Sequence, residues 1–179
     1  MAGNIILVGF MGAGKTVIGK RLALRLGLKF VDLDREIERI VKMSIPLIFK
    51  RHGLIRFRSE EELMIARICR SINQVIATGG GAILKETNRQ VLKEGGKVIW
   101  LKADPEQIVK RVGQGKGRPL LKRGNIKEIV EKLLTERQVL YQEVAHHSID
   151  TDNKSIEEIV DELYRMLKDE YHGKQNDRN

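Results

Sequence analysis

The residues with the clearest chemical potential form a glycine-rich segment near the start of the chain. Residues 9–16, GFMGAGKT, match the pattern G-x-x-x-x-G-K-[ST]. In this pattern the glycines let backbone N–H groups surround phosphate oxygens, the lysine reaches the β- and γ-phosphates, and the final hydroxyl binds Mg²⁺. The alternative is a glycine-rich turn without a ligand, but the apolar run before the motif and the amphipathic segment after it favour a phosphate site. We predict that a nucleotide binds at Gly12, Ala13, Gly14, Lys15, Thr16 and Val17.

Two carboxylates end the second predicted strand. Asp32 and Asp34 are two residues apart, so on an extended strand they share one face. Ligands of open parallel sheets bind beyond the carboxyl ends of the strands, where this pair is expected. We predict that one carboxylate holds Mg²⁺ through water and that the other accepts a hydrogen bond from a substrate hydroxyl. The alternative is that one of the two merely caps a helix starting at Arg35, a role for which Asp34 is well placed.

Two arginines are candidates for binding an anion. Arg137 interrupts the apolar stripe of a long predicted helix, and a cation there is costly unless an anion meets it. The alternatives are that it reaches past the helix edge to solvent, or that it pairs with Glu136 or Glu143. Arg58 precedes Glu61 by three residues, and Glu61 lies on an apolar stripe, which indicates a partly buried pair.

Residues 112–125, VGQGKGRPLLKRGN, contain four glycines and four basic residues. Glycines supply hinge freedom, and Arg118 supplies a cation that could fold over bound phosphates. We predict a mobile lid here, with a solvated basic loop as the alternative.

Composition limits the class of protein. The 179 residues suit one domain, and the apolar fraction of 41% argues against disorder. The net charge of +9 is spread among acidic residues and aromatics make up only 4%, so we expect a site for anionic ligands and no nucleic-acid partner. A single cysteine and the lack of a long apolar run predict a cytoplasmic protein with no membrane partner and no signal peptide.

Short apolar segments alternate with longer amphipathic ones along the chain. Strands are predicted at 5–8, 29–34, 74–78, 97–101 and 147–151. Helices are predicted at 15–26, 35–51, 54–72, 86–94, from 104, at 126–145 and from 155, where Ser155 and Glu158 have capping-box spacing. This alternation predicts an α/β fold with a mostly parallel sheet and helices on both faces. We expect one domain over 1–170 and a disordered tail at 171–179.

Taken in order, the motifs resemble those of the shikimate kinase family. The resemblance covers about residues 5–168 and is carried by GFMGAGKT at 9–16, DLD at 32–34, FRSEE at 57–61, TGGG at 78–81, GRPLL at 117–121 and ERQVLY at 136–141. Many nucleotide-binding enzymes share the first motif, whereas TGGG, RPLL and ERxxLY discriminate most. The resemblance implies a three-layer P-loop fold like that of nucleoside-monophosphate kinases, with a five-stranded parallel sheet in the order 2-3-1-4-5.

The family resemblance also implies an activity. It implies transfer of the γ-phosphoryl group of ATP to the 3-hydroxyl of shikimate, in aromatic amino-acid biosynthesis, with Mg²⁺ as cofactor. Lys15 and Arg118 are implied to neutralise the transferring phosphate, and Thr16 and Asp32 to hold Mg²⁺. Asp34 is implied to orient the attacking hydroxyl and to take its proton.

The resemblance assigns the remaining site residues by position. They are Arg58, Arg137, Gly79, Gly80 and Gly81 for the shikimate carboxylate, Glu61 as a brace for Arg58, and Arg111 over the adenine. Because glycine allows close backbone approach, the triplet can offer N–H groups to a small acid, with a plain tight turn as the alternative. On this interpretation, Gly80→Val should obstruct the acceptor and spare ATP binding.

Three features depart from the family pattern. Leu54 follows Gly53 where the family usually has Glu, Ser59 replaces a basic residue, and 152–156 lacks a proline that often helps to enclose adenine. The alternative functions are another small-metabolite P-loop kinase and a basic, nucleotide-dependent protein that binds nucleic acid. We expect a monomer with ATP and shikimate as its ligands.

Overall fold

The computed structural model describes residues 3–112 and 125–172. Within these residues five parallel strands form one sheet in the order β2-β3-β1-β4-β5, which confirms the implied order. The strands are β1 (Asn4–Val8), β2 (Lys29–Asp32), β3 (Gln74–Ala77), β4 (Gly96–Lys102) and β5 (His147–Asp150). The segment 113–124, which includes Arg118 and most of the predicted lid, lies outside the described residues.

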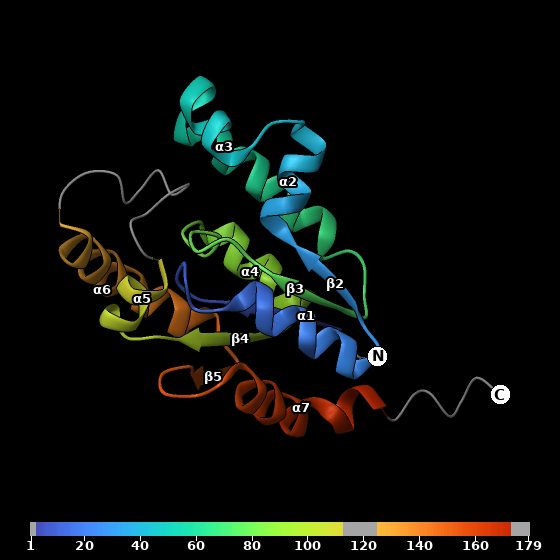
Figure 1. Cartoon of the computed structure of the whole chain (residues 1–179). Helices are drawn as coiled ribbons and strands as arrows, with labels where there is room; N and C mark the ends of the chain where they lie inside the picture. The colour runs from blue at the N-terminus through green and yellow to red at the C-terminus, as the bar shows by residue number, and fades with distance from the viewer. Residues whose placement is uncertain (1–2, 113–124, 173–179) are drawn as a thin grey trace.

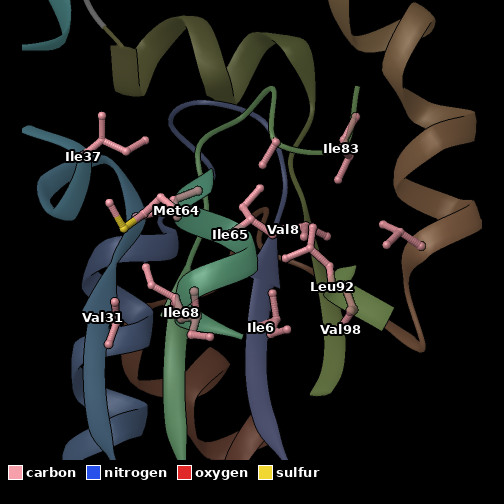
Figure 2. Close-up of a cluster of buried hydrophobic side chains, with 14 of the residues drawn as sticks. Ile6, Val8, Val31, Ile37, Met64, Ile65, Ile68, Ile83, Leu92 and Val98 are labelled. Carbon is pink, nitrogen blue, oxygen red and sulfur yellow. The ribbon is translucent and has the colours of Figure 1, made fainter. Parts of the chain in front are cut away.

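Helices cover both faces of the sheet (Figure 1). They are α1 (Lys15–Leu26), α2 (Leu33–Val41), α3 (Ile45–Ile68), α4 (Glu86–Gly95), α5 (Pro105–Val112), α6 (Ile126–Val144) and α7 (Ile156–His172). Alternate side chains of β1 belong to opposite halves of the core. Ile5 and Leu7 pack with α1 and α7, whereas Ile6 and Val8 pack with α2, α3, α4 and α6, as Figure 2 shows in part. No helix among the described residues is long and apolar enough to cross a membrane.

The sequence signals for the ends of α1 and α7 have clear structural counterparts. Gly27 ends α1 in the left-handed conformation, with φ 67°. The predicted capping box is confirmed, because the Ser155 N–H donates to Glu158 at 2.7 Å and the Glu158 N–H donates to the Ser155 hydroxyl at 3.2 Å. At its other end α7 includes Tyr171, which is buried, and continues to His172. The prediction of a disordered tail from residue 171 is therefore wrong for 171–172.

Two predicted element boundaries are also wrong, one at the end of β2 and one within the helix predicted at 35–51. β2 ends at Asp32, and Asp34 lies in the first turn of α2 instead of on the strand. The single helix predicted at 35–51 is interrupted, because α2 ends at Val41 and α3 begins at Ile45. Pro46 lies in the first turn of α3, a position typical of a helix start. The apolar periodicity continues across it, which is why the sequence predicted one helix.

Helix α3 contains a break at Gly53. Its φ of 77° and ψ of −179° are a combination that only glycine adopts readily. The break lies between Phe49 and Phe57, whose ring centroids are 4.9 Å apart. A Cβ at position 53 would meet no atom within 4 Å. The position therefore requires glycine for its backbone conformation and not for space.

We expect Gly53→Ala to lower the free energy of unfolding by about 1–3 kcal/mol, because alanine must adopt a strained backbone even though its methyl group has room. Urea-induced unfolding followed by circular dichroism measures this change. Ser59→Ala, at an exposed position of the same helix, serves as the control and should cost less than about 0.5 kcal/mol. Equal stability of Gly53→Ala and the wild type would show that the break imposes no strain.

Candidate active site

A cleft of about 540 Å³ opens at the carboxyl ends of the strands. Its walls come from the glycine-rich loop after β1, the β2–α2 junction, α3, the turn at 78–81 after β3, and single residues of α5 and α6. Because β2, β3 and β1 are neighbours in the sheet, the segments that follow them meet at one edge. The fold thus brings together residues that are far apart in the sequence.

The loop between β1 and α1 has the backbone shape of a phosphate cradle. Gly9, Gly12 and Gly14 have φ values of 146°, 83° and 89°, which side-chain-bearing residues rarely adopt. A Cβ at Gly9 would lie 2.5 Å from a backbone oxygen of Leu101, so the loop is also packed tightly against β4. The buried ammonium of Lys15 donates to the carbonyls of Gly9 and Phe10 on the same loop, at 2.8 Å each.

Thr16 and Asp32 meet at the start of α1. The Thr16 hydroxyl donates to Oδ2 of Asp32 at 2.9 Å, and Oδ1 of Asp32 accepts from the backbone N–H of Arg35 at 3.3 Å. Asp32 is therefore the N-cap of α2, so one of the two aspartates does cap the helix, but it is Asp32 and not Asp34.

Asp34 supplies an acceptor oxygen with no partner. Its Oδ1 is buried and has no hydrogen bond among the described residues. Burial, reinforced by the Asp32 carboxylate, raises the pKa of Asp34 above its ordinary value, and Lys15 opposes this effect. An unpaired carboxylate of this kind is suited to receive a hydrogen bond from a ligand.

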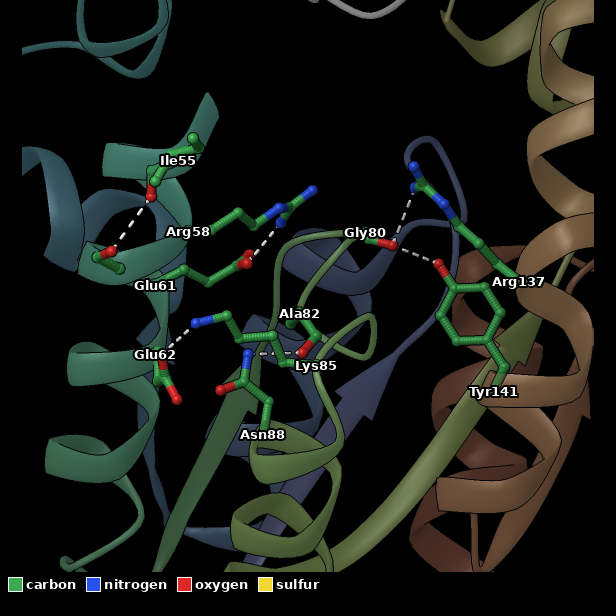
Figure 3. Close-up of polar contacts among 11 residues, drawn as sticks. Ile55, Arg58, Glu61, Glu62, Gly80, Ala82, Lys85, Asn88, Arg137 and Tyr141 are labelled. Carbon is green, nitrogen blue, oxygen red and sulfur yellow. Dashed lines mark hydrogen bonds and ion pairs between the residues drawn. The ribbon is translucent and has the colours of Figure 1, made fainter. Parts of the chain in front are cut away.

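Arg58 and Glu61 form a largely buried pair on α3 (Figure 3). Nη1 of Arg58 lies 2.5 Å from Oε2 of Glu61, whose side chain is 1% exposed, so the expected pairing is present. Oε1 of Glu61 is buried and has no partner within the described parts of the chain. Burial raises the pKa of Glu61, although the guanidinium of Arg58 lowers it in part.

Arg137 is buried on α6 and faces the same turn from the other side (Figure 3). Its Nη1 donates to the carbonyl of Gly80 at 3.2 Å, and its guanidinium lies 5.5 Å from the ring centroid of Phe10. Glu143 pairs instead with Arg89 at 3.1 Å. Because Arg137 forms no ion pair within 3–112 and 125–172, the alternative of a partner on its own helix is wrong.

The turn at 79–81 has no room for side chains. A Cβ at Gly79 would lie 2.9 Å from Oδ1 of Asp34 and 3.0 Å from Oε1 of Glu61, and a Cβ at Gly81 would overlap the guanidinium of Arg58. A Cβ at Gly80 would instead lie 3.1 Å from the backbone nitrogen of Met11. The added side chain would press on the phosphate loop, so the structure leads us to expect that Gly80→Val disturbs ATP binding as well as the acceptor site.

Arg111 borders the cleft at the end of α5. Its guanidinium donates to the hydroxyl of Thr151 at 3.0 Å and to the carbonyl of Thr151 at 2.8 Å, and it lies 3.7 Å from Asp152. These contacts join α5 to the start of the segment 152–156, which lacks the family's proline. The segment still supports Arg111 at the edge of the cleft.

The cleft contains most of the predicted site residues. Those lining it are Gly12, Gly14, Lys15, Thr16, Val17, Asp32, Asp34, Arg58, Glu61, Gly79, Gly80, Gly81, Arg111 and Arg137. Ala13 does not line it, because its side chain packs in the core with α1 and α7.

Several residues that line the cleft were not predicted from the sequence as site residues. They are Met11, Glu38, Ile45, Pro46, Phe49, Phe57 and Thr78. Glu38 had a usable signal, because it follows Asp34 by four residues and so lies on the same face of a helix. In the structure its carboxylate accepts from the Ile45 N–H at 2.8 Å.

A parallel sheet in this order, a phosphate-binding loop and an adjacent carboxylate define a P-loop phosphotransferase. The family model for shikimate kinase matches residues 11–168. A shikimate kinase from Pelotomaculum thermopropionicum is 47% identical over 166 residues, which cover 93% of this chain and 96% of that protein. One from Pseudomonas aeruginosa is 42% identical over 92% of this chain and 96% of its own length. The chain belongs to the shikimate kinase family.

Solved structures agree with this assignment. The structure of shikimate kinase from Acinetobacter baumannii in complex with shikimate is similar, with a TM-score of 0.90 and 39% identity over 94% of this chain and 95% of that one. The structure of shikimate kinase from Aquifex aeolicus has a TM-score of 0.81 and 33% identity over 92% of this chain and 96% of that one.

The raised pKa of Asp34 gives a testable effect of pH on stability. Above the unfolded-state pKa of about 3.9, the folded protein binds more protons at this carboxyl than the unfolded chain does, so the carboxyl lowers stability as pH rises. Asp34→Asn should therefore be more stable than the wild type at neutral pH, by about 1 kcal/mol or roughly 2–4 °C in Tm. This gain should shrink at about pH 4.

Thermal unfolding at the two pH values measures the effect. Asp32→Ala is the comparison and should be destabilised at both pH values, because it removes the oxygens that hold Thr16 and cap α2. A lower Tm for Asp34→Asn at neutral pH would contradict the prediction.

Proposed function

We propose that the chain phosphorylates the 3-hydroxyl of shikimate with ATP, and that the cleft is its active site. The observation that carries the proposal is the arrangement around the 79–81 turn. Arg58 and Arg137 approach the turn from opposite sides (Figure 3), and the unpartnered Oδ1 of Asp34 lies beside Gly79. Shikimate has one carboxylate and several hydroxyls, so guanidinium donors and a carboxylate acceptor complement it.

Asp34 would orient the attacking hydroxyl and accept its proton. Its raised pKa makes the carboxylate a better proton acceptor than an exposed aspartate. Because phosphoryl transfer passes through a loose transition state, accurate positioning contributes more than a strong base. Because Asp34 lies beside the 79–81 turn, which packs against the phosphate loop, its carboxylate would hold the hydroxyl near the phosphates of ATP.

The loop after β1 would bind the phosphates of ATP. In the present structure Lys15 is held by two carbonyls of its own loop, and phosphate oxygens would offer its ammonium a charged partner in their place. Arg111 at the edge of the cleft would cover the adenine, and Arg118 would contribute a second cation to the transferring phosphate.

Thr16 and Asp32 fit a Mg²⁺ ion, because their hydroxyl and carboxylate oxygens lie 2.9 Å apart at the phosphate loop. The described residues contain no group of three or more His, Cys, Asp or Glu that could hold a metal, which suits an ion shared between protein and phosphates. When bound, such an ion neutralises charge on the β- and γ-phosphate oxygens. We expect a monomeric, cytoplasmic enzyme.

Coupled ADP-release assays with Mg-ATP test the proposed function directly. Shikimate, gluconate and nucleoside monophosphates are compared as acceptors at equal concentration. We expect kcat/KM for shikimate to exceed the others by at least about 100-fold, because its rigid ring can present the carboxylate to the arginines and a hydroxyl to Asp34 together. Gluconate is an open chain that must be ordered first, and nucleoside monophosphates carry a bulkier phosphate in place of the carboxylate. Turnover of another acceptor without turnover of shikimate would refute the proposal.

The acceptor and phosphate roles predict different kinetic effects of substitution. Arg137→Ala should raise the KM for shikimate by about 10- to 100-fold through loss of a charge-assisted bond. Lys15→Ala should instead lower kcat, by about 100-fold or more. Steady-state kinetics with each substrate varied separate the two effects.

Arg165→Ala is the matched control, since Arg165 is an exposed arginine of α7 and does not line the cleft. Its kinetic constants should equal those of the wild type. An unchanged shikimate KM in Arg137→Ala would show that the carboxylate binds elsewhere.

A further inference from the structure

We propose that Tyr141 is a positioning residue of the acceptor site, whose hydroxyl holds the carbonyl of Gly80 and so leaves Arg137 available for the acceptor carboxylate. The inference rests on the proposed function and adds a residue to which that function assigns no role. Tyr141 lies deep in α6, with 0% of its surface exposed.

The Gly80 carbonyl accepts two hydrogen bonds from α6 (Figure 3). The Tyr141 hydroxyl donates at 2.6 Å, and Nη1 of Arg137 donates to the same oxygen at 3.2 Å. The two residues are four apart, so their side chains lie on one face of the helix. The shorter bond comes from Tyr141, which does not line the cleft, whereas Arg137 does.

The tyrosine ring also has a defined packing partner. It stacks on Trp100 of β4, with ring centroids 5.7 Å apart and an interplanar angle of 19°. The hydroxyl is therefore placed by both the helix and the sheet. Burial also raises the pKa of the Tyr141 hydroxyl, so it remains a donor throughout the neutral pH range.

This arrangement divides two tasks between two residues. A buried carbonyl left without a donor costs about 1–3 kcal/mol. With Tyr141 in place, Arg137 can turn its donors toward an incoming carboxylate while the Gly80 carbonyl keeps a partner. Without the hydroxyl, Arg137 would be the remaining donor to this oxygen, and the acceptor would compete with the turn for the same guanidinium.

Tyr141→Phe tests the inference, because it removes the hydroxyl and retains the stacked ring. We expect the KM for shikimate to rise by about 5- to 20-fold, corresponding to one buried hydrogen bond, with kcat and the KM for ATP within about twofold of the wild type. Amide hydrogen exchange of a peptide covering 78–84 should also become faster in the free enzyme.

Tyr171→Phe is the matched control. Its hydroxyl is likewise buried and donates to a backbone carbonyl, that of Asn4, at 3.3 Å, at the opposite end of β1 from the phosphate loop. Both variants should lose some thermal stability. Only Tyr141→Phe should change the KM for shikimate and the hydrogen exchange of the turn.

The Arg137→Ala background gives a second readout. The combined variant leaves the Gly80 carbonyl without either donor, so its loss of unfolding free energy should exceed the sum of the two single losses. An additive result would show that the two side chains do not share this carbonyl.

An unchanged shikimate KM in Tyr141→Phe would overturn the inference, as would equal increases in both KM values, which indicate a general loss of structure. If the wild type failed to use shikimate, the proposed function would fall, and hydrogen exchange of the turn would still decide whether Tyr141 holds it. Equal exchange of 78–84 in the wild type and Tyr141→Phe would then overturn the inference by itself.

Discussion

The lack of side chains in the 79–81 turn is the constraint on which the rest of the cleft depends. Asp34 and Glu61 approach Gly79 so closely that a single Cβ would lie about 3 Å from both carboxylates, and Arg58 occupies the space beside Gly81. Gly80 meets the phosphate loop in the same way. Helices α2 and α3 and the phosphate loop can therefore converge on one short backbone segment, where the proposed acceptor would lie beside the phosphates of ATP.

The cleft holds polar groups that the described parts of the chain leave without partners. Asp34 and Glu61 each keep a buried oxygen without a hydrogen bond there, although Glu61 is paired with Arg58 through its other oxygen, and Arg137 has no carboxylate partner within the same residues. Unpaired groups of this kind lower stability, so they are expected where a ligand supplies the missing partners. A ligand that brings a carboxylate and hydroxyls would satisfy these groups together, which links the energetic cost of the site to its selectivity.

The sequence was sufficient for the features that depend on local chemistry. The phosphate loop and α1 follow from one motif, and the capping box at Ser155 from two residues. It was insufficient where tertiary contacts decide the outcome. Asp34 reaches the cleft from a helical turn and not from a strand, and the direction of a Cβ at Gly80 depends on how the turn packs against the phosphate loop. Neither property has a local signal.

Leu54 and Ser59, which depart from the family pattern, bear on how Arg58 is supported. Leu54 is 47% exposed, and the hydroxyl of the exposed Ser59 donates to the Ile55 carbonyl within α3. Arg58 instead pairs with Glu61, and its guanidinium lies 5.4 Å from the ring centroid of Phe57. The absence of a side chain at Gly81 leaves room for the guanidinium. Because Glu61 and Phe57 are buried, Arg58 keeps its support although Leu54 and Ser59 depart from the family pattern. The buried face of α3 therefore positions the arginine without a contribution from these two exposed side chains.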